Sequence, residues 1–196
     1  MSGPDGNILK IENVVKTFEG VHALDHVSFA VKKGHIKALI GPNGAGKTTL
    51  LNAISGLLPP DSGSVYLNDR QVAGLTPDRI AFLGLSRTFQ LVRLFTINEA
   101  TVLDNVMLGA HKRLRPGIVD AIFRPGKMRR AEREAEERAA ELLQFVGLGG
   151  KEKVFPATLS FGNQRLLELA RSLMTDPQML LLDEPASGLN DAEVET

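Results

Sequence analysis

The clearest chemical signal in the sequence is a glycine-rich stretch between a predicted strand and a predicted helix. Residues 41–48 read Gly-Pro-Asn-Gly-Ala-Gly-Lys-Thr and match the pattern G-x-x-x-x-G-K-[ST] in full, which argues against an ordinary glycine-rich turn. Such glycines let backbone N–H groups turn toward a phosphate, and the helix N-terminus adds a favourable partial charge. Lys47 would reach the β- and γ-phosphates of a nucleotide, and the Thr48 hydroxyl would ligate Mg²⁺. The residues expected to bind the nucleotide here are Gly41, Pro42, Asn43, Gly44, Ala45, Gly46, Lys47, Thr48 and Thr49.

Two adjacent carboxylates, Asp183 and Glu184, follow the apolar run 179–182, which has the character of a buried strand. Parallel strands deliver ligands at their carboxyl ends, so both side chains are expected at such an edge. Asp183 would hold Mg²⁺ through water, and Glu184 would polarise a water molecule aimed at the γ-phosphate. A strand followed by a solvated Asp-Glu pair is common, so the pair alone is a weak indication of function. Together with the phosphate-binding stretch it becomes a strong one.

A third signal is the segment 159–165, which reads Leu-Ser-Phe-Gly-Asn-Gln-Arg at the start of a predicted helix. Ser160 is a favourable N-cap residue and Gly162 exposes backbone N–H groups, so this helix end could bind an anion. A merely capped helix explains the same residues equally well, and from the residues alone both interpretations stay open.

The elements that position these residues follow from the spacing of apolar side chains. In residues 1–90 the predicted strands are 8–14, 27–31, 36–40, 64–67 and 85–89, and the predicted helices are 46–57 and 77–83. Prolines and Gly63 in the stretch 59–63 are expected to end the first helix, and Thr76 to open the second. Asn68-Asp69 predicts a turn.

After Asn98 the pattern becomes mainly helical. Amphipathic spacing predicts a helix around 100–110, a long charged helix over 124–146 that glycines at 147–150 end, a helix over 164–174 and a strand over 178–182. The long helix is expected to form the ion pairs Arg133/Glu137 and Glu134/Arg138, four residues apart on one solvated face. Its basic residues could instead face an acidic partner or lipid headgroups, although the apolar face of a membrane-surface helix is missing. These basic residues are Arg124, Lys127, Arg129 and Arg130.

Composition narrows the functional classes. The chain has 196 residues, 43% of them hydrophobic and 23% charged, which suits a soluble domain. Its 23 basic and 23 acidic residues cancel, which argues against a dominant nucleic-acid-binding surface. The absence of cysteine excludes a disulfide framework, a thiolate zinc site and a cysteine nucleophile. Neither a secretory signal nor an apolar run of about 20 residues occurs, so we expect a cytoplasmic protein.

The order of the three motifs resembles that of the ATP-binding cassette (ABC) ATPases. Segment 159–165 stands in the place of the family signature, and 185–190 follows the acidic strand as in the family, over a chain that is similar from about residue 8 to its end. This resemblance implies an α/β fold, a P-loop NTPase (ABC ATPase) core with an antiparallel β subdomain and an inserted helical subdomain. It implies one ABC ATPase domain over 8–196, made of a nucleotide-binding β/α core 8–90, a helical subdomain 91–158 and the signature helix and acidic strand 159–196.

The resemblance also implies roles for single residues. Phe18 sits where the family stacks an aromatic ring on adenine, although a Phe after an apolar strand is otherwise a core residue. Gln90 is similar to the family glutamine that touches Mg²⁺ and the attacking water. The implied catalytic residues are Glu184, Gln90 and Lys47, and the implied metal-binding residues are Thr48, Gln90 and Asp183. The implied signature residues, which would close over ATP held by the opposite subunit, are Ser160, Phe161, Gly162, Asn163 and Gln164.

Within the family, the segments 88–95, 101–106 and 187–190 and the charged insertion look most like the ATPase subunits of branched-chain amino acid importers. Urea and related amide importers share much of that pattern. Such a subunit would lie on the inner face of the cell membrane, where it would bind transmembrane permease subunits and a second ABC ATPase subunit. It would act indirectly with a periplasmic or extracellular solute-binding protein. It would bind no nucleic acid. The alternatives are a soluble ABC ATPase acting on nucleic acid or ribosomes, and a nucleotide-binding interaction module.

Several residues depart from the family pattern. Phe161 replaces a common Gly and Asn163 a common Gln in the signature, and Asn190 replaces a common Asp in the loop after the acidic strand. The family also continues to a histidine that contacts the γ-phosphate, whereas the histidines here all precede Glu184. We therefore expect a C-terminally truncated subunit whose hydrolysis in isolation is doubtful.

An apolar cluster just after Gln90 is the last sequence feature with a functional interpretation. It consists of Leu91, Val92, Leu94 and Phe95. We expect it to dock the permease, because movement of Gln90 on nucleotide binding would shift these residues directly. The alternative is that they belong to the core of the helical insertion.

Overall fold

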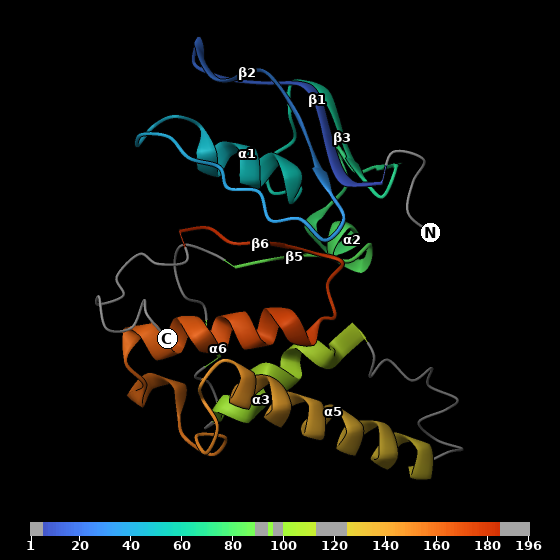
Figure 1. The fold of residues 1–196 in the computed structure, drawn as a ribbon, viewed down its shortest axis with the longest axis vertical. Coiled ribbons are helices and arrows are strands. Elements are labelled where there is room, and N and C mark those ends of the chain that lie inside the picture. The colour runs from blue at the N-terminus through green and yellow to red at the C-terminus, as the bar shows by residue number, and fades with distance from the viewer. Residues whose placement is uncertain (1–5, 89–93, 96–99, 113–124, 185–196) are drawn as a thin grey trace. The chain divides into compact units, whose positions relative to one another are not determined.

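The computed structural model describes residues 6–88, 94–95, 100–112 and 125–184. The chain divides into two compact units, 1–85 and 86–196. The first is built on a β-sheet and the second on packed helices (Figure 1). Among the described residues, no helix combines the length and the apolar character needed to cross a membrane.

The first unit contains a four-stranded sheet in the order β2-β1-β3-β4, with each neighbouring pair antiparallel. Its strands are β1 (Asn7–Phe18), β2 (Val21–Lys32), β3 (Ser62–Leu67) and β4 (Arg70–Gln71). In the central strand β1, Ile11 is in register with Phe29 of β2 and Val65 of β3, and both Ile11 and Val65 are buried. The predicted strands 8–14, 27–31 and 64–67 are thereby confirmed, and so is the antiparallel β subdomain.

Two tight turns close the hairpins of this sheet. Glu19 and Gly20, between β1 and β2, have φ angles of 46° and 87°, and Asn68 and Asp69, between β3 and β4, have φ angles of 47° and 62°. Two-residue hairpins favour such left-handed pairs because their twist matches that of the strands. The predicted Asn68-Asp69 turn is confirmed.

Two helices complete the first unit, α1 (Lys47–Ile54) and α2 (Pro77–Phe82). Helix α2 starts after Thr76 as predicted, with a proline at its first position. Helix α1 ends before the predicted residue 57, because Gly56 adopts a φ of 76°. A Cβ at Gly56 would lie 2.5 Å from the Leu75 carbonyl oxygen, so the close approach there requires glycine.

The prediction of a strand over 36–40 is wrong. Among the described residues, no strand pairs with this segment, and Ile36 and Ile40 are 101% and 89% exposed. The nearby backbone turns instead, with the His35 N–H donating to the Lys32 carbonyl. An apolar run becomes a strand only where a neighbouring strand completes its hydrogen bonds, and the run alone does not supply that neighbour.

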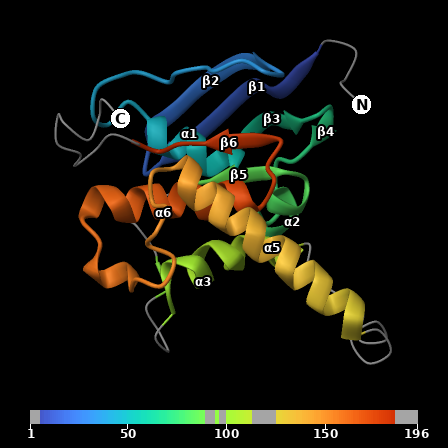
Figure 2. The same ribbon diagram turned by 60° about the horizontal axis from the view of Figure 1, so that its bottom comes forward.

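The second unit is built around three helices, α3 (Val102–Met107), α5 (Pro125–Phe145) and α6 (Phe161–Met174), which pack on one another (Figure 2). Short 3₁₀ helices flank them, η2 (Leu108–Lys112) and η3 (Pro156–Thr158). The two-stranded sheet of β5 (Leu85–Arg87) and β6 (Met179–Leu181) completes the described structure. The predicted helices are confirmed, although α6 begins at Phe161 instead of residue 164, because Ser160 caps it.

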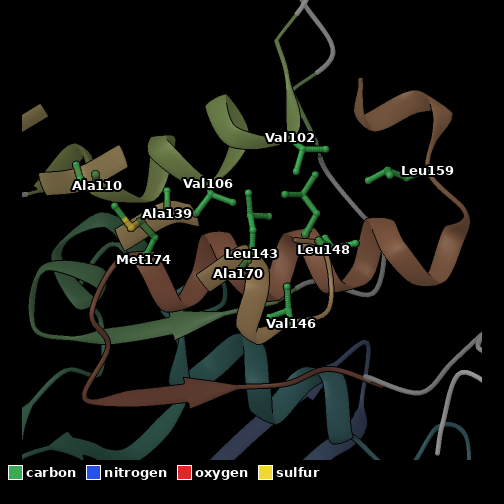
Figure 3. Packing of buried hydrophobic residues seen from close by; sticks show 12 residues of the cluster. Val102, Val106, Ala110, Ala139, Leu143, Val146, Leu148, Leu159, Ala170 and Met174 are labelled. Atoms are coloured by element: carbon green, nitrogen blue, oxygen red, sulfur yellow. The ribbon is translucent and has the colours of Figure 1, made fainter. Parts of the chain in front are cut away.

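The core of the second unit is a cluster of small and branched apolar side chains (Figure 3). Its members from α3, η2, α5, α6 and the adjoining loops include Val102, Val106, Ala110, Ala139, Leu143, Val146, Leu148, Leu159, Ala170 and Met174. Gly109 lets η2 approach α6 closely, because a Cβ there would lie 2.5 Å from the Arg171 carbonyl oxygen. At the start of α3, Thr101 and Asp104 form a capping box in which each side chain bonds the other's backbone N–H.

The ion pairs of α5 differ from the predicted ones. Arg130 Nε lies 2.8 Å from Glu134 Oε1, and Arg138 Nη2 lies 3.7 Å from Asp176 Oδ1 in the turn after α6. Glu134 therefore pairs with the arginine one turn before it, and Arg138 contributes to tertiary packing instead. Arg129 and Arg130 are exposed, as a solvated face requires.

Candidate functional site

The glycine-rich loop leads directly into α1, whose N-cap is Gly46. Gly44 and Gly46 have φ angles of 81° and 80°, in the left-handed region that favours glycine. A Cβ at Gly46 would lie 2.2 Å from the Ala23 carbonyl oxygen of β2, whereas a Cβ at Gly44 would meet nothing within 4 Å. The sheet therefore holds the end of the loop against β2 and leaves its middle open.

The N-terminus of α1 carries no cap of its own. Among the described residues, no side chain bonds its first N–H groups, and no acidic residue lies in its first turn. These N–H groups and the helix dipole favour a bound anion. Thr48 is exposed, and the Lys47 Nζ donates to the carbonyl oxygens of Gly41 (2.7 Å) and Pro42 (2.8 Å). An ammonium group and unsatisfied N–H groups thus meet at one loop, and this donor set fits a nucleotide phosphate.

Phe18 ends β1 in the same unit and is 45% exposed. Lys16 Nζ lies 5.7 Å from the centroid of its ring. Because nearly half of this side chain is accessible, Phe18 is not a core residue, and its ring is available for stacking.

In the second unit, Asp183 follows β6 and is buried against β5. Its Oδ2 atom lies 2.8 Å from Arg87 Nη2, and both side chains are about one-twentieth exposed. The Asp183 N–H donates to the Thr88 hydroxyl over 3.4 Å, and the Thr88 N–H donates to the Leu181 carbonyl over 3.0 Å. Glu184 is exposed and has a φ of 48°, and its carbonyl oxygen accepts a hydrogen bond of 3.3 Å from Arg165 Nη1.

The signature segment begins α6. Ser160 Oγ accepts a hydrogen bond from the Asn163 N–H over 3.3 Å, which confirms it as the N-cap. The Gln164 amide donates back to the Pro156 and Leu159 carbonyls, over 3.3 and 3.2 Å. Phe161 is half-exposed and Gly162 is buried. This helix end is therefore capped by its own residues.

Two arginines in this region have no role in the sequence predictions. Arg165 lies 5.2 Å from the centroid of the Phe161 ring and bonds Glu184, so it links the signature helix to the acidic pair. Arg87 pairs with Asp183. A charged residue on the apolar face of a helix or inside a short strand is the signal that could have revealed both.

Some predicted residues lie outside the described part of the chain, namely Gln90, Leu91, Val92 and Asn190. Leu94 is partly buried and packs on the helical core, and Phe95 is 52% exposed. The backbone N–H and carbonyl of Phe95 are held by the buried Asn105 amide, over 2.8 and 2.9 Å.

Known ABC transporter proteins are similar to this chain in sequence. The ABC transporter family model matches residues 24–187. LivG of Salmonella typhimurium, a high-affinity branched-chain amino acid transport ATP-binding protein, is 40% identical over 186 residues, 95% of this chain and 72% of LivG. BraF of Pseudomonas aeruginosa, of the same description, is 40% identical over 188 residues, 96% of this chain and 73% of BraF.

Solved structures are similar as well. The ADP conformation of MJ1267, an ATP-binding cassette of an ABC transporter, has a TM-score of 0.78 and 35% identity, covering 96% of this chain and 73% of MJ1267. The dimeric structure of MJ0796, a bacterial ABC transporter cassette, has a TM-score of 0.77 and 29% identity, covering 95% of this chain and 78% of that one. With its phosphate-binding loop, signature helix and acidic pair in family order, this chain belongs to the ABC transporter family as an ATP-binding cassette.

Proposed function

We propose that this protein binds and hydrolyses ATP to power an importer of branched-chain amino acids. The observation that carries the proposal is the uncapped N-terminus of α1 with Lys47 lying across its loop, in a chain that is 40% identical to LivG and BraF. A structural turn would satisfy its own donors, whereas this one leaves them for an anionic ligand.

In the proposed reaction the loop 41–46 and Lys47 hold the ATP phosphates, and Phe18 stacks on adenine. The oxygen atoms of Thr48, Gln90 and Asp183 would hold Mg²⁺, Asp183 through water, since hard oxygen donors suit this ion. The bound ion would neutralise charge that develops on the phosphates. Glu184 orients the attacking water and accepts its proton, and Arg165 holds the Glu184 backbone for that task.

Two copies are needed for a complete site in this proposal. Ser160, Phe161, Gly162, Asn163 and Gln164 form the signature surface that closes over ATP held by a second ABC ATPase subunit. The dimeric structure of MJ0796 supports such pairing. Hydrolysis then depends on assembly, which links it to transport. For this role the parts 8–90, 91–158 and 159–196 act as one cassette.

The permease is proposed to dock at Phe95, on the inner face of the membrane. Leu94 packs on the helical core, as the core interpretation requires, but the Phe95 ring is half-exposed while Asn105 holds its backbone. A large apolar side chain presented on a fixed backbone suits a partner interface. Phe95→Ser is expected to abolish co-purification with permease subunits and to leave ATP affinity unchanged. Retained co-purification would remove Phe95 from the interface.

Uptake measurements test the transport function. Deleting the coding sequence from the source cell should abolish uptake of radiolabelled leucine, isoleucine and valine, and the restored gene should recover it. Glu184→Gln should bind ATP and fail to restore uptake, because an amide cannot accept the proton. Glu141→Gln, which changes an exposed carboxylate on α5, is the matched control and should restore it. Loss of urea uptake in place of leucine uptake would instead favour the urea and amide importer alternative.

A further inference from the structure

The ion pair between Arg87 and Asp183 is the most buried charge interaction near the acidic pair. The two side chains are 5% and 6% exposed, and Arg87 Nη2 lies 2.8 Å from Asp183 Oδ2. Removing two charges from water costs several kcal/mol per ion, and apolar residues of similar size are often at least as stabilising. Fold stability alone therefore does not explain why two adjacent strands keep this pair.

The geometry of the pair leaves one carboxylate oxygen available. Oδ2 accepts from Arg87, and the Asp183 backbone N–H is bound to the Thr88 hydroxyl. Among the described residues, the Oδ1 atom of Asp183 has no hydrogen-bond partner. Oδ1 is not one of the fully buried side-chain atoms that lack a partner, so it is accessible to a ligand that donates a hydrogen bond to it.

We propose that Arg87 is a positioning residue for Mg²⁺, one that holds Oδ2 of Asp183 so that Oδ1 accepts a hydrogen bond from a metal-bound water. This inference rests on the proposed function, in which Asp183 serves the metal of Mg·ATP. Partners that orient a metal-serving carboxylate typically contribute 10- to 100-fold to metal affinity. Thr88 adds to the same effect, because it holds the backbone from which the carboxylate extends.

The test compares ATP affinity with excess Mg²⁺ and with a chelator, measured by calorimetry on the full chain. The dissociation constant measured with the chelator, divided by the one measured with Mg²⁺, gives the factor by which Mg²⁺ strengthens ATP binding. Arg87→Met should lower that ratio about 10-fold or more and change the metal-free affinity less than about 2-fold. Arg87→Lys should recover part of the ratio, because the contact uses a single nitrogen. Arg171→Met, which breaks the pair of Arg171 with buried Glu168 in the same unit, is the matched control and should leave the ratio unchanged.

The outcomes distinguish failure of the role of Arg87 from failure of the metal role of Asp183. If Arg87→Met folds and its ratio is unchanged, the inference is overturned. An increased ratio also overturns it, because it would mean that Arg87 competes with the metal. If Arg87→Met does not fold, Arg87→Gln decides in the same way, since its amide keeps a neutral hydrogen bond and should lower the ratio by a smaller factor. A wild-type chain that binds ATP equally well with and without Mg²⁺ would overturn the metal role of Asp183, and with it this inference.

Discussion

Helices α1 and α6 both begin in family motifs, but only the N-terminus of α6 is capped by a side chain. Helix α1 starts at a left-handed glycine with no side-chain cap, whereas α6 starts at Ser160, whose hydroxyl accepts the Asn163 N–H. An uncapped end leaves donors for a ligand within the same chain, and a capped end stands without one. Under the proposed function, the first motif therefore depends on nucleotide to complete its hydrogen bonds, while the second is a preformed surface.

The largest expected effect concerns the glycine that makes α1 uncapped. Gly46→Ala should lower the free energy of unfolding by about 3 kcal/mol, because its Cβ meets the Ala23 carbonyl at 2.2 Å in a left-handed backbone. Gly44→Ala has nearly the same φ but open surroundings, so it should cost only about 1 kcal/mol. Urea unfolding measures both, and equal losses would show that the contact with β2 is unimportant.

Lys47→Ala should weaken ATP binding about 100-fold, because hydrogen bonds to charged groups are worth about 1.5–3 kcal/mol. Lys37→Ala is the matched control. Lys37 also donates to a backbone carbonyl, that of Ala30 at 2.7 Å, but it stands outside the glycine-rich loop. Calorimetric titration with ATP should separate the two variants, and equal affinities would contradict the role of Lys47.

Ser160→Ala tests the capped end. Loss of an N-cap hydroxyl should lower the free energy of unfolding by about 1 kcal/mol, and Ser160→Asp should largely preserve it. Neither change should alter ATP affinity of the single chain, because the proposal assigns Ser160 to nucleotide of the opposite subunit. Thermal unfolding and calorimetry measure the two quantities, and a large fall in ATP affinity would show that α6 serves its own chain's nucleotide.

The smallest expected effect is a pH dependence at a third helix N-terminus, that of α3. Hydrogen bonds from the Thr101 hydroxyl and backbone lower the pKa of Asp104. Its stabilising contribution is therefore complete above the unfolded pKa of about 3.9 and is lost as pH falls through the lower folded pKa. Asp104→Asn should reduce stability at pH 7 and flatten this part of the acid unfolding curve. An unchanged curve would show that the capping box does not set it.

The sequence predicts the local elements well and the pairing of strands less well. Turn residues such as Asn68-Asp69 act through their own backbone, so the pattern around them is enough. The segment 36–40 is apolar, but its conformation depends on a neighbouring strand, which the run itself does not encode. The partner of Asp183 was missed for the same reason, because Arg87 is distant in the sequence and only the pairing of β5 with β6 brings them together.

In the proposed function, the contacts of Lys47 also affect the entropy of nucleotide binding. A free lysine side chain loses up to about 1.5–2 kcal/mol of rotamer freedom when it is immobilised. Here two carbonyl oxygens already hold its ammonium group, so that ordering accompanies folding and not ligand capture. An incoming phosphate then exchanges existing hydrogen bonds for stronger, charge-assisted ones. Under the proposed function, the loop is a preorganised receptor whose cation is ordered before the anion arrives.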